Sequence, residues 1–384
     1  MKIVCLVSSL NSGGAERVMT VLCNAWSARG DQVTLVPTYS GGGKPFYKVS
    51  DRVELVYLAD ACRAKGKNPW NYIRRAHALR RLILDRHPDV VVSFMPNVNV
   101  AAAVSLLQAS IPLIICERDD PSSRSRFDFW EICARFAYPL ADMLTVQTDA
   151  VAAKVGHFYP GVQTVRTIPN PLAQGVADYT ARGSGSRHVL LGMGRLVAQK
   201  QVHRMIEAFS AVADTHPDWD LHIYGDGPLK EVLSGLIESL GLRGRVALMG
   251  KTTEPWAVMA AADAFVMTSA HEGFPNAMLE AMAIGLPCAV FDCPSGPRDL
   301  SLGGSDALLV PLNDHDALVS ALGRLMADKK LRTSLGARAR RSVRERFSLP
   351  RVLQMWDALF EEVGAIPLGA NREKPALASL ERLS

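Results

Sequence analysis

Short apolar runs alternate with amphipathic segments along most of the chain. In the first half, the apolar runs predict strands at residues 2–7, 32–37, 53–57, 90–94, 113–116, 143–147 and 164–168. The segments between them predict helices at 16–29, 70–86, 98–109, 127–138 and 150–158. Strands that are apolar almost throughout, alternating with helices, are typical of a parallel sheet with both faces covered. The first half therefore predicts a doubly wound α/β domain.

A glycine- and serine-rich segment at 173–187 has few large apolar residues and indicates a linker. The alternation then restarts, with strands predicted at 188–191, 221–224, 246–248, 264–268, 287–291 and 307–310 and helices at 202–214, 229–240, 255–262, 276–284, 314–327, 330–347 and 349–363. The expected organisation is an N-terminal domain at 1–175, a C-terminal domain at 188–347, a helix within 348–366 that packs back toward the N-terminal domain, and a loose tail at 367–384. In such sheets ligands bind at the carboxyl ends of the strands.

Composition and charge change this picture little. The 384 residues are 48% hydrophobic and 21% charged, as in soluble globular domains. The net charge of +5 is too small to indicate nucleic acid as a partner, although residues 1–175 alone carry 20 Lys and Arg against 14 Asp and Glu. The seven cysteines include no C-x-x-C pair, which favours reduced thiols.

Two segments bear on the location of the protein. Residues 90–116 contain no charged side chain, but prolines and polar amides divide them into a predicted strand, helix and strand rather than a membrane span. The N-terminus enters a strand directly and is not a convincing signal peptide. These features favour a cytoplasmic protein.

The most informative segment is HEGFPNAMLEAMAIGL, which begins at His271 and follows a predicted strand. Gly273 and Pro275 predict a tight turn, and a helix that begins near Asn276 would direct free backbone N–H groups toward an anion. Glu280 lies in the middle of this otherwise apolar helix, where an unpartnered carboxylate costs several kcal/mol. Sugar hydroxyls would be suitable partners, and pairing of Glu280 with a buried arginine is the structural alternative.

Glycine-rich turns follow other predicted strands. In GMGRLVAQK, Arg195 and Lys200 come after Gly194, and two cations beside such a turn suit a diphosphate. YGDGP at 224–228 is another such turn, and NSGGAE places Gly13 and Gly14 before the first helix. Dinucleotide and P-loop motifs are not matched, because a third glycine and a Walker A sequence are missing.

Taken together, these motifs resemble those of the family-4 retaining glycosyltransferases, which have the GT-B fold. The matching pieces are GGAER, IPNPL at 168–172, GRLVAQK, YGDGP and EGFPNAMLE, the last carrying the E-x7-E motif from Glu272 to Glu280. In order and spacing the match covers nearly the whole chain and is closest to bacterial enzymes that extend lipid-linked or surface polysaccharides. It implies two doubly wound Rossmann-like domains facing across a cleft, an N-terminal domain that binds the acceptor and a C-terminal domain that binds a nucleotide sugar.

The resemblance also implies residue roles. Arg195 and Lys200, beside Gly194, would neutralise the diphosphate of the donor, and Glu280 would bind the ribose hydroxyls. Glu272, with the backbone from Gly273 through Phe274 and Pro275 to Asn276, would hold the donor sugar, so that Glu272, Arg195 and Lys200 form the expected catalytic group. Gly13 and Gly14 would line the donor site from the N-terminal domain. No protein nucleophile is implied.

One departure from the family pattern concerns the acceptor side. Many relatives carry a histidine after the fifth N-terminal strand, where this chain has CERDDP at 116–121. Glu117 or Asp119 could take the place of that histidine or meet the acceptor hydroxyl. The alternative is a polar loop in which Arg118 pairs internally.

Metal and membrane binding complete the expectations. The D-x-D sequences at 218–220 and 314–316 precede a strand and begin a helix, so we expect no metal and no cofactor. Residues 63–81 hold seven Lys and Arg and no acidic residue, with aromatic and aliphatic side chains between them. Near an anionic leaflet each such cation contributes about 1 kcal/mol, so this basic segment could dock the N-terminal domain on the inner membrane face. An ordinary solvated helix face is the alternative.

The sequence thus predicts a retaining glycosyltransferase that moves a hexose or N-acetylhexosamine from a nucleotide diphosphate sugar, UDP being favoured, to a saccharide, with a lipid-linked glycan as the expected acceptor. A UDP-sugar 2-epimerase of the same architecture and a non-catalytic nucleotide-sugar-binding partner are the two alternatives.

Overall fold

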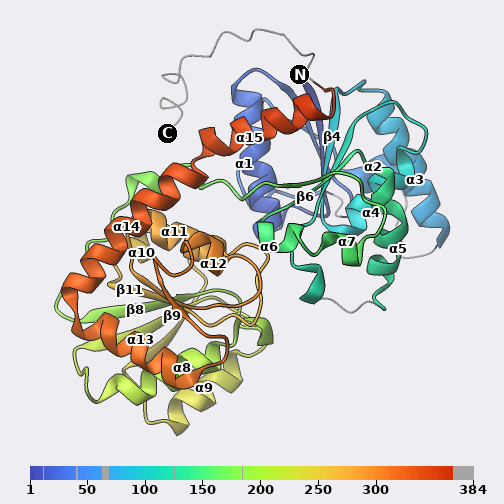
Figure 1. The fold of residues 1–384 in the computed structure, drawn as a ribbon. Coiled ribbons are helices and arrows are strands. Elements are labelled where there is room, and N and C mark those ends of the chain that lie inside the picture. The colour runs from blue at the N-terminus through green and yellow to red at the C-terminus, as the bar shows by residue number, and fades with distance from the viewer. Residues whose placement is uncertain (12, 40–41, 63–68, 124–126, 184, 366–384) are drawn as a thin grey trace. The chain divides into compact units, whose positions relative to one another are not determined.

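The computed structural model describes residues 1–11, 13–39, 42–62, 69–123, 127–183 and 185–365. The chain forms two compact units (Figure 1). Unit 1 contains residues 1–170 and the segment from 352 onward, and unit 2 contains residues 171–351. The expected tail at 367–384 and the first part of the basic segment, 63–68, lie outside the described residues.

Unit 1 is built on a seven-stranded parallel sheet in the order β3-β2-β1-β4-β5-β6-β7. Its strands are β1 (Lys2–Val7), β2 (Gln32–Pro37), β3 (Glu54–Leu55), β4 (Val90–Phe94), β5 (Leu113–Cys116), β6 (Met143–Val146) and β7 (Val165–Thr167). The helices are α1 (Gly14–Ala28), α2 (Leu58–Cys62), α3 (Pro69–Leu84), α4 (Pro96–Ser105), α5 (Phe129–Ala137), α6 (Asp149–Ala152) and α7 (Val155–Phe158), with 3-10 turns η1 (Pro121–Ser123) and η2 (Tyr138–Leu140). Helices cover both faces of the sheet (Figure 1).

The C-terminal helix α15 (Leu349–Glu362) packs against α1 of unit 1. Trp356 of α15 meets Trp26 of α1 edge to face, with 5.6 Å between ring centroids. Arg29 forms an ion pair with Asp357 at 2.7 Å. Both tryptophans are buried, so their contact stabilises this packing in addition to the partly buried ion pair.

Unit 2 repeats the plan with a six-stranded parallel sheet in the order β10-β9-β8-β11-β12-β13. Its strands are β8 (His188–Met193), β9 (Trp219–Tyr224), β10 (Val246–Gly250), β11 (Ala264–Met267), β12 (Cys288–Phe291) and β13 (Leu308–Val310). The helices are α8 (Val202–Ala213), α9 (Lys230–Ser239), α10 (Pro255–Ala260), α11 (Asn276–Ile284), α12 (Pro297–Leu300), α13 (His315–Ala327) and α14 (Lys329–Phe347), with 3-10 turns η3 (Val176–Asp178) and η4 (Ala198–Lys200). One core cluster includes side chains of α8, α9 and α13, and another includes side chains of α10, α11 and α14.

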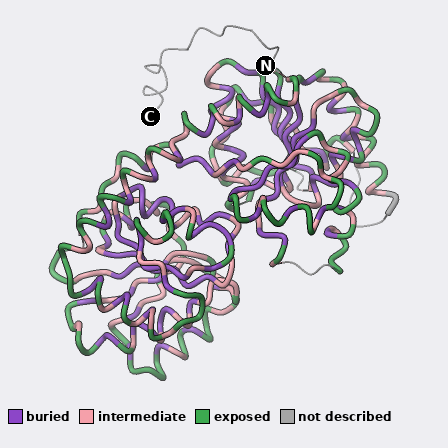
Figure 2. The backbone as a smooth tube through the Cα atoms, viewed as in Figure 1, coloured by how far each residue is buried: buried purple, intermediate pink, exposed green. Residues whose placement is uncertain are grey.

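The predicted alternation of strands and helices is confirmed, because apolar runs that are buried on both faces form the strands. Figure 2 shows both sheets as buried segments inside more exposed helices. The observed ends of some elements differ from the predicted ones. The predicted strand 53–57 is only the two-residue strand β3, and the predicted helix 150–158 is two short helices, α6 and α7. No helix among the described residues is long and apolar enough to cross a bilayer.

The segment at 173–187 is not a free linker in its described part. Val176 is buried, and the backbone N–H groups of Ala181 and Arg182 donate to the carbonyls of Ile284 and Ala260 at 3.0 and 2.8 Å. The segment lies within unit 2, which begins at 171 rather than 188. Few apolar residues suffice here, because backbone hydrogen bonds attach the segment to α10 and α11.

Candidate active site

The residues of the C-terminal motifs follow two neighbouring strands of unit 2. β8 and β11 are hydrogen-bonded to each other, with Leu191 opposite Phe265. Strand order reverses between them, since the chain builds outward from β8 to β10 and then outward from β11 to β13. Ligands of doubly wound sheets bind at the carboxyl ends of the strands beside such a reversal.

Lys200 and Glu272 are brought together at this edge although 72 positions separate them. The Lys200 ammonium lies 2.5 Å from Oε1 of Glu272, and the two side chains are 22% and 8% exposed. The loops that carry them are tied by a hydrogen bond from the N–H of Ala270 to the carbonyl of Gln199, at 2.8 Å. Thr268, at the end of β11, also donates to the carbonyl of Lys200. The pair is therefore held in place before any ligand binds.

Glu280 is buried on α11 with the indole of Trp256 as a hydrogen-bond partner. The carboxylate is in a residue only 4% exposed, and Nε1 of Trp256 donates to its Oε2 at 3.1 Å. Trp256 belongs to α10, and the ring of Tyr179 packs against it with 6.0 Å between centroids. A charge-assisted hydrogen bond of this kind offsets part of the cost of burying a carboxylate.

Arg195 is exposed, and no described side chain or carbonyl forms a hydrogen bond or ion pair with its guanidinium. The loop that carries Arg195 is hydrogen-bonded to the YGDGP turn: the N–H of Leu196 donates to the carbonyl of Asp226 at 3.0 Å. Gly225 has a φ of +144°, and a Cβ there would lie 1.8 Å from the carbonyl oxygen of Gly194. The glycine of YGDGP is thus required for close packing beneath the Arg195 loop.

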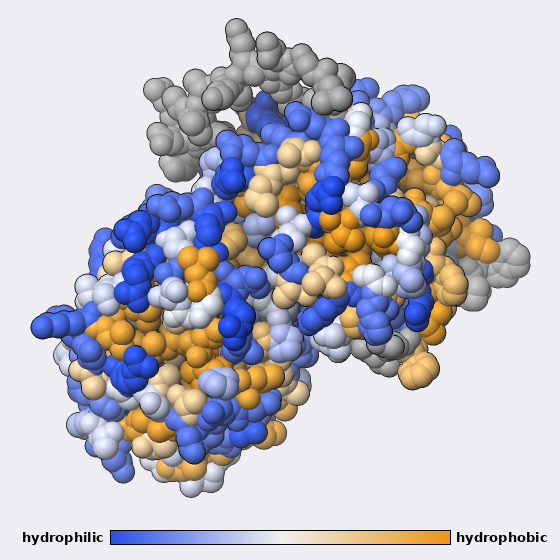
Figure 3. All heavy atoms as spheres, in the orientation of Figure 1, coloured by the Kyte–Doolittle hydropathy of each residue, from blue (hydrophilic) through white to orange (hydrophobic). Residues whose placement is uncertain are grey.

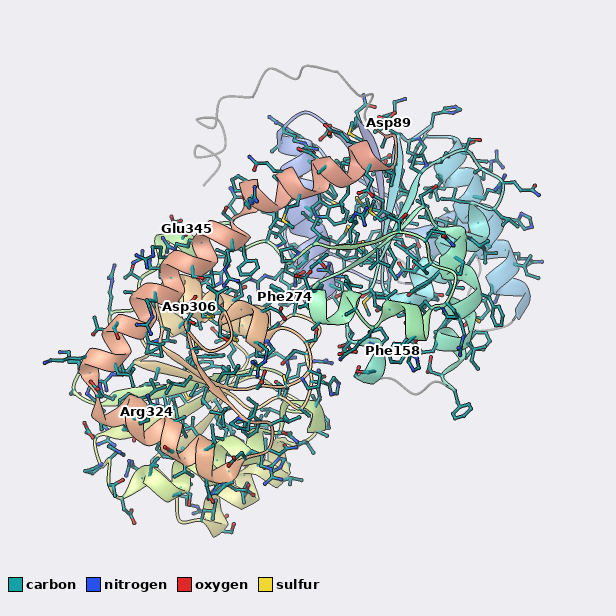
Figure 4. The ribbon with its side chains drawn as sticks, in the orientation of Figure 1. Asp89, Phe158, Phe274, Asp306, Arg324 and Glu345 are labelled. Carbon is teal, nitrogen blue, oxygen red and sulfur yellow. The ribbon has the colours of Figure 1, made fainter. Side chains whose placement is uncertain are left out.

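The turn before α11 is supported by the loop after β12. Ser295 donates through its hydroxyl to the carbonyl of Gly273 at 3.0 Å, and a Cβ on Gly296 would lie 2.3 Å from Cδ of Pro275. Phe274, which is labelled in Figure 4, belongs to this turn. Its ring packs against that of Phe347, with 5.7 Å between the ring centroids. No side chain caps α11, whose first backbone N–H groups lie at the same edge as the ion pair.

Cys293 lies close enough to Glu272 and Lys200 for both charges to act on its pKa. Burial raises the pKa of Cys293 to about 12, and the negative charge of Glu272 adds to this effect. A thiol with such a pKa is a weak nucleophile at neutral pH. Within the described ranges, no group of three or more His, Cys, Asp or Glu is placed to hold a metal ion.

Two family models match the chain and together span both units. The model described as Glycosyltransferase Family 4 matches residues 12–173, and the model described as Glycosyl transferases group 1 matches residues 182–342.

The chain belongs to glycosyltransferase family 4.

Curated relatives and solved structures agree with the two models. The glycosyltransferase is 26% identical over 370 residues to the Campylobacter jejuni GalNAc-α-(1→4)-GalNAc-α-(1→3)-diNAcBac-PP-undecaprenol α-1,4-N-acetyl-D-galactosaminyltransferase, covering 94% of this chain and 99% of the relative. It is 29% identical over 385 residues to an exopolysaccharide phosphotransferase of Streptomyces coelicolor, covering 91% of this chain but only 39% of that protein.

Among solved structures, a sucrose-phosphate synthase from Thermosynechococcus elongatus matches with a TM-score of 0.81 at 17% identity, over 95% of this chain and 99% of that one. S. aureus TarM, solved with fondaparinux, α-GlcNAc-glycerol and UDP, matches with a TM-score of 0.76 at 15% identity, over 94% and 99%. The fold of the glycosyltransferase is GT-B.

In unit 1 of the glycosyltransferase, Gly13 caps α1 and Gly14 begins it. A Cβ on Gly13 would lie 2.0 Å from Oε2 of Glu16, whose Oε1 accepts a hydrogen bond from Ser9 at 3.1 Å. The Glu16 carboxylate thus lies beside Gly13, and the role of Gly13 and Gly14 in lining the donor site stays a prediction.

Glu117 does not face an acceptor. It is 2% exposed, and its Oε2 accepts hydrogen bonds from the hydroxyls of Tyr138 and Tyr159 at 3.1 and 3.2 Å. This corrects its assignment to the acceptor side, because a carboxylate enclosed by two tyrosines is part of the interior of unit 1. Asp119 is partly exposed and accepts a hydrogen bond from the N–H of Asp120.

Sequence reasoning missed two polar side chains of the glycosyltransferase. Trp256 gave no signal, because a tryptophan near the start of a predicted helix is usually a core residue. Arg118 was considered only as the internal partner of a neighbouring carboxylate, whereas its Nη2 donates to Oδ1 of Asn170. In the sequence, the feature that pointed to this contact was Asn170 of the IPNPL motif, to which no role had been assigned.

Proposed function

We propose that the protein is a retaining glycosyltransferase that transfers a hexose or N-acetylhexosamine from a UDP-sugar to a saccharide acceptor carried on a lipid. The observation that carries the proposal is the Lys200–Glu272 ion pair, held beside exposed Arg195 at the strand reversal of unit 2. Support for UDP comes from the UDP complex of TarM, and support for a lipid-linked acceptor comes from the undecaprenol substrate in the name of the Campylobacter jejuni relative.

Lys200 changes partner in this proposal. In the free protein its ammonium pairs with Glu272, and a bound diphosphate attracts it more strongly because the diphosphate carries more negative charge. Arg195 adds a planar fork of donors to the same anion. Glu272 is then released to accept hydrogen bonds from hydroxyls of the donor sugar, while Glu280 accepts them from the ribose.

During sugar transfer, negative charge develops on the departing diphosphate, where Arg195 and Lys200 would stabilise it. The bond from the anomeric carbon to the diphosphate oxygen breaks, and a bond from the acceptor hydroxyl oxygen to that carbon forms on the same face. The hydroxyl proton passes to the departing diphosphate, so that the anomeric configuration is retained. Preorganised cations of this kind are worth about 10²–10³ in turnover each. We propose that they replace a metal, so that EDTA leaves turnover unchanged.

Nucleotide binding tests the donor assignment. UDP, GDP and ADP are titrated into the wild type, Glu280→Ala and the exposed control Glu231→Ala, with the melting temperature as readout. Ligand at 100 times Kd stabilises the fold by about 2.7 kcal/mol. We expect UDP to stabilise the wild type and the control but not Glu280→Ala. A protein that responds to no nucleotide contradicts the proposal.

Turnover separates the alternatives. A 2-epimerase would consume UDP-N-acetylglucosamine without any acceptor and release UDP, and a non-catalytic partner would bind the donor without turnover. We expect product only when lipid-linked saccharide is added. The presence of both cations and both glutamates of the motif favours the transferase.

We further propose that unit 1 binds the acceptor and docks on an anionic membrane surface on the cytoplasmic side. In α3, Arg80 is occupied, because its Nη1 donates to the carbonyl of Ser105 at 2.8 Å. Arg74 and Arg81 are exposed, and Arg81 lies 3.7 Å from the carboxylate of Asp85. Among the described cations of α3, Arg74 is thus more accessible to lipid than Arg80.

A row of exposed apolar side chains on α5, which we call the apolar ridge, would contribute to membrane binding in addition to the cations of α3. Phe129, Ile132 and Phe136 are 65%, 45% and 75% exposed. Tyr72 of α3 packs against Trp130 of α5, with 6.0 Å between ring centroids, so the ridge adjoins the basic helix. Figure 3 shows apolar side chains, in orange, at the surface of unit 1. Aromatic side chains beside cations are typical of helices that lie in the membrane interface.

A further inference from the structure

Arg118 carries a charge in unit 1, and no carboxylate of the described residues forms an ion pair with its guanidinium. It follows β5 by two residues, at the carboxyl edge of the sheet. Its Nη2 donates to Oδ1 of Asn170, and its guanidinium lies 4.2 Å from the centre of the Phe94 ring. Nε is buried without a hydrogen-bond partner. Among the described residues, the hydrogen-bond and ring contacts of its side chain are therefore with the neutral groups of Asn170 and Phe94.

Two acidic residues near it in sequence, Glu117 and Asp120, have other partners. Glu117 accepts from two tyrosines, as described above. Asp120 accepts from Ser122 and lies 3.4 Å from the ammonium of Lys154. Burial lowers the pKa of Arg118 to about 10, although the nearby thiol of Cys116 and the Glu117 carboxylate act in the opposite direction. A buried charge in this state is stabilised by any anion that reaches it.

The guanidinium is held in one orientation. Asn170 is 2% exposed and accepts a second hydrogen bond from Nε2 of Gln147, at 2.8 Å. Phe94 fixes the plane of the guanidinium from one side. Arg118 itself is partly exposed, so part of its donor fork faces solvent. An immobilised planar fork suits phosphate or carboxylate better than a flexible lysine would.

We propose that Arg118, framed by Asn170 and Phe94, is an anion-binding site in unit 1 that holds a phosphate or carboxylate group of the acceptor saccharide. The inference rests on the proposed function, in which unit 1 receives the acceptor. It gives the IPNPL motif a role, since its asparagine orients the arginine. It also means that the acceptor is selected by charge as well as by hydroxyl pattern.

Weak-ligand binding to the full chain tests the site. UDP is first added at saturation to fill the proposed donor site. Glucose 1-phosphate, glucuronate and glucose are then titrated and followed by saturation-transfer NMR. The variants are Arg118→Gln and a matched control, Arg52→Gln, which removes an exposed arginine of the same unit.

We expect one anionic sugar to bind about tenfold tighter than glucose, a preference that Arg118→Gln removes, Arg52→Gln keeps and added salt weakens. Preference for the phosphate identifies a sugar phosphate or lipid diphosphate as the source, and preference for glucuronate identifies a uronic acid. The proposal is overturned if neither anion is preferred over glucose, or if Arg118→Gln retains the preference.

Folding and donor binding are controlled separately. If Arg118→Gln does not fold, Arg118→Lys keeps the charge without the fork, and we expect it to lose several-fold in anion affinity; wild-type affinity in this variant would also overturn the proposal. If the wild type fails to bind UDP, the donor assignment is wrong. The same titrations on the nucleotide-free chain still decide the role of Arg118.

Discussion

Replacing Trp256 by phenylalanine keeps an aromatic ring but removes a hydrogen bond to a buried carboxylate, together with part of the ring packing. The indole N–H lies 3.1 Å from Oε2 of Glu280, and Glu280 is 4% exposed, so water cannot readily take the place of the indole. A hydrogen bond to a charged group contributes about 1.5–3 kcal/mol. For a unit of this size 1 kcal/mol corresponds to about 2–4 °C, so we expect the melting temperature of Trp256→Phe to fall by about 3–12 °C.

The same change has a specific effect on nucleotide recognition if Glu280 binds the ribose. The wild type should bind UDP about ten- to a hundredfold tighter than 2′-deoxy-UDP, because the deoxy compound lacks a hydroxyl that the carboxylate accepts. In Trp256→Phe the carboxylate loses the indole donor that orients it, and this ratio should fall. Calorimetric titration of both nucleotides measures it.

Tyr179→Phe is the matched control, since it alters the ring that packs on Trp256 without touching the hydrogen bond. It should leave the nucleotide ratio unchanged. The reasoning is refuted if Trp256→Phe melts within about 1 °C of the wild type and keeps the full preference for UDP.

Three further predictions concern the rest of the molecule. Lys200→Met leaves the buried Glu272 carboxylate without its cation, so turnover should fall on the order of 10²–10³ and stability by about 3 kcal/mol, as followed by steady-state kinetics and urea unfolding. In unit 1, burial alone would raise the pKa of Asp31, but hydrogen bonds from the N-terminal ammonium and Arg29 outweigh it and lower the pKa. The resulting stabilisation is present above the ordinary pKa of an aspartate and is lost as pH falls through the lowered value, so acid unfolding curves of Asp31→Asn should be flatter than those of the wild type. Phe136→Ser should reduce sedimentation with vesicles of anionic lipid, whereas Val232→Ser, a change at an exposed apolar residue of unit 2, should not; equal loss in both would contradict docking through α5.

The alternation of elements was predictable because it depends on local periodicity. A strand buried on both faces needs an unbroken apolar run, as in Val90–Phe94, and nothing distant changes that requirement. The E-x7-E motif was recognisable for a similar reason, since Glu280 is conspicuous in an apolar helix. Short elements such as β3 were misjudged at their ends, where few residues carry the pattern.

Tertiary structure alone decided which polar side chains meet. Lys200 and Glu272 are 72 positions apart and pair because β8 and β11 are neighbours in the sheet. Glu117 and Arg118 are adjacent in sequence, yet one is enclosed by tyrosines while the other is held by Asn170. Loops after strands have no periodicity, so their composition cannot tell which way a side chain points. That direction is set by the packing of the neighbouring strands, which the sequence of the loop does not contain.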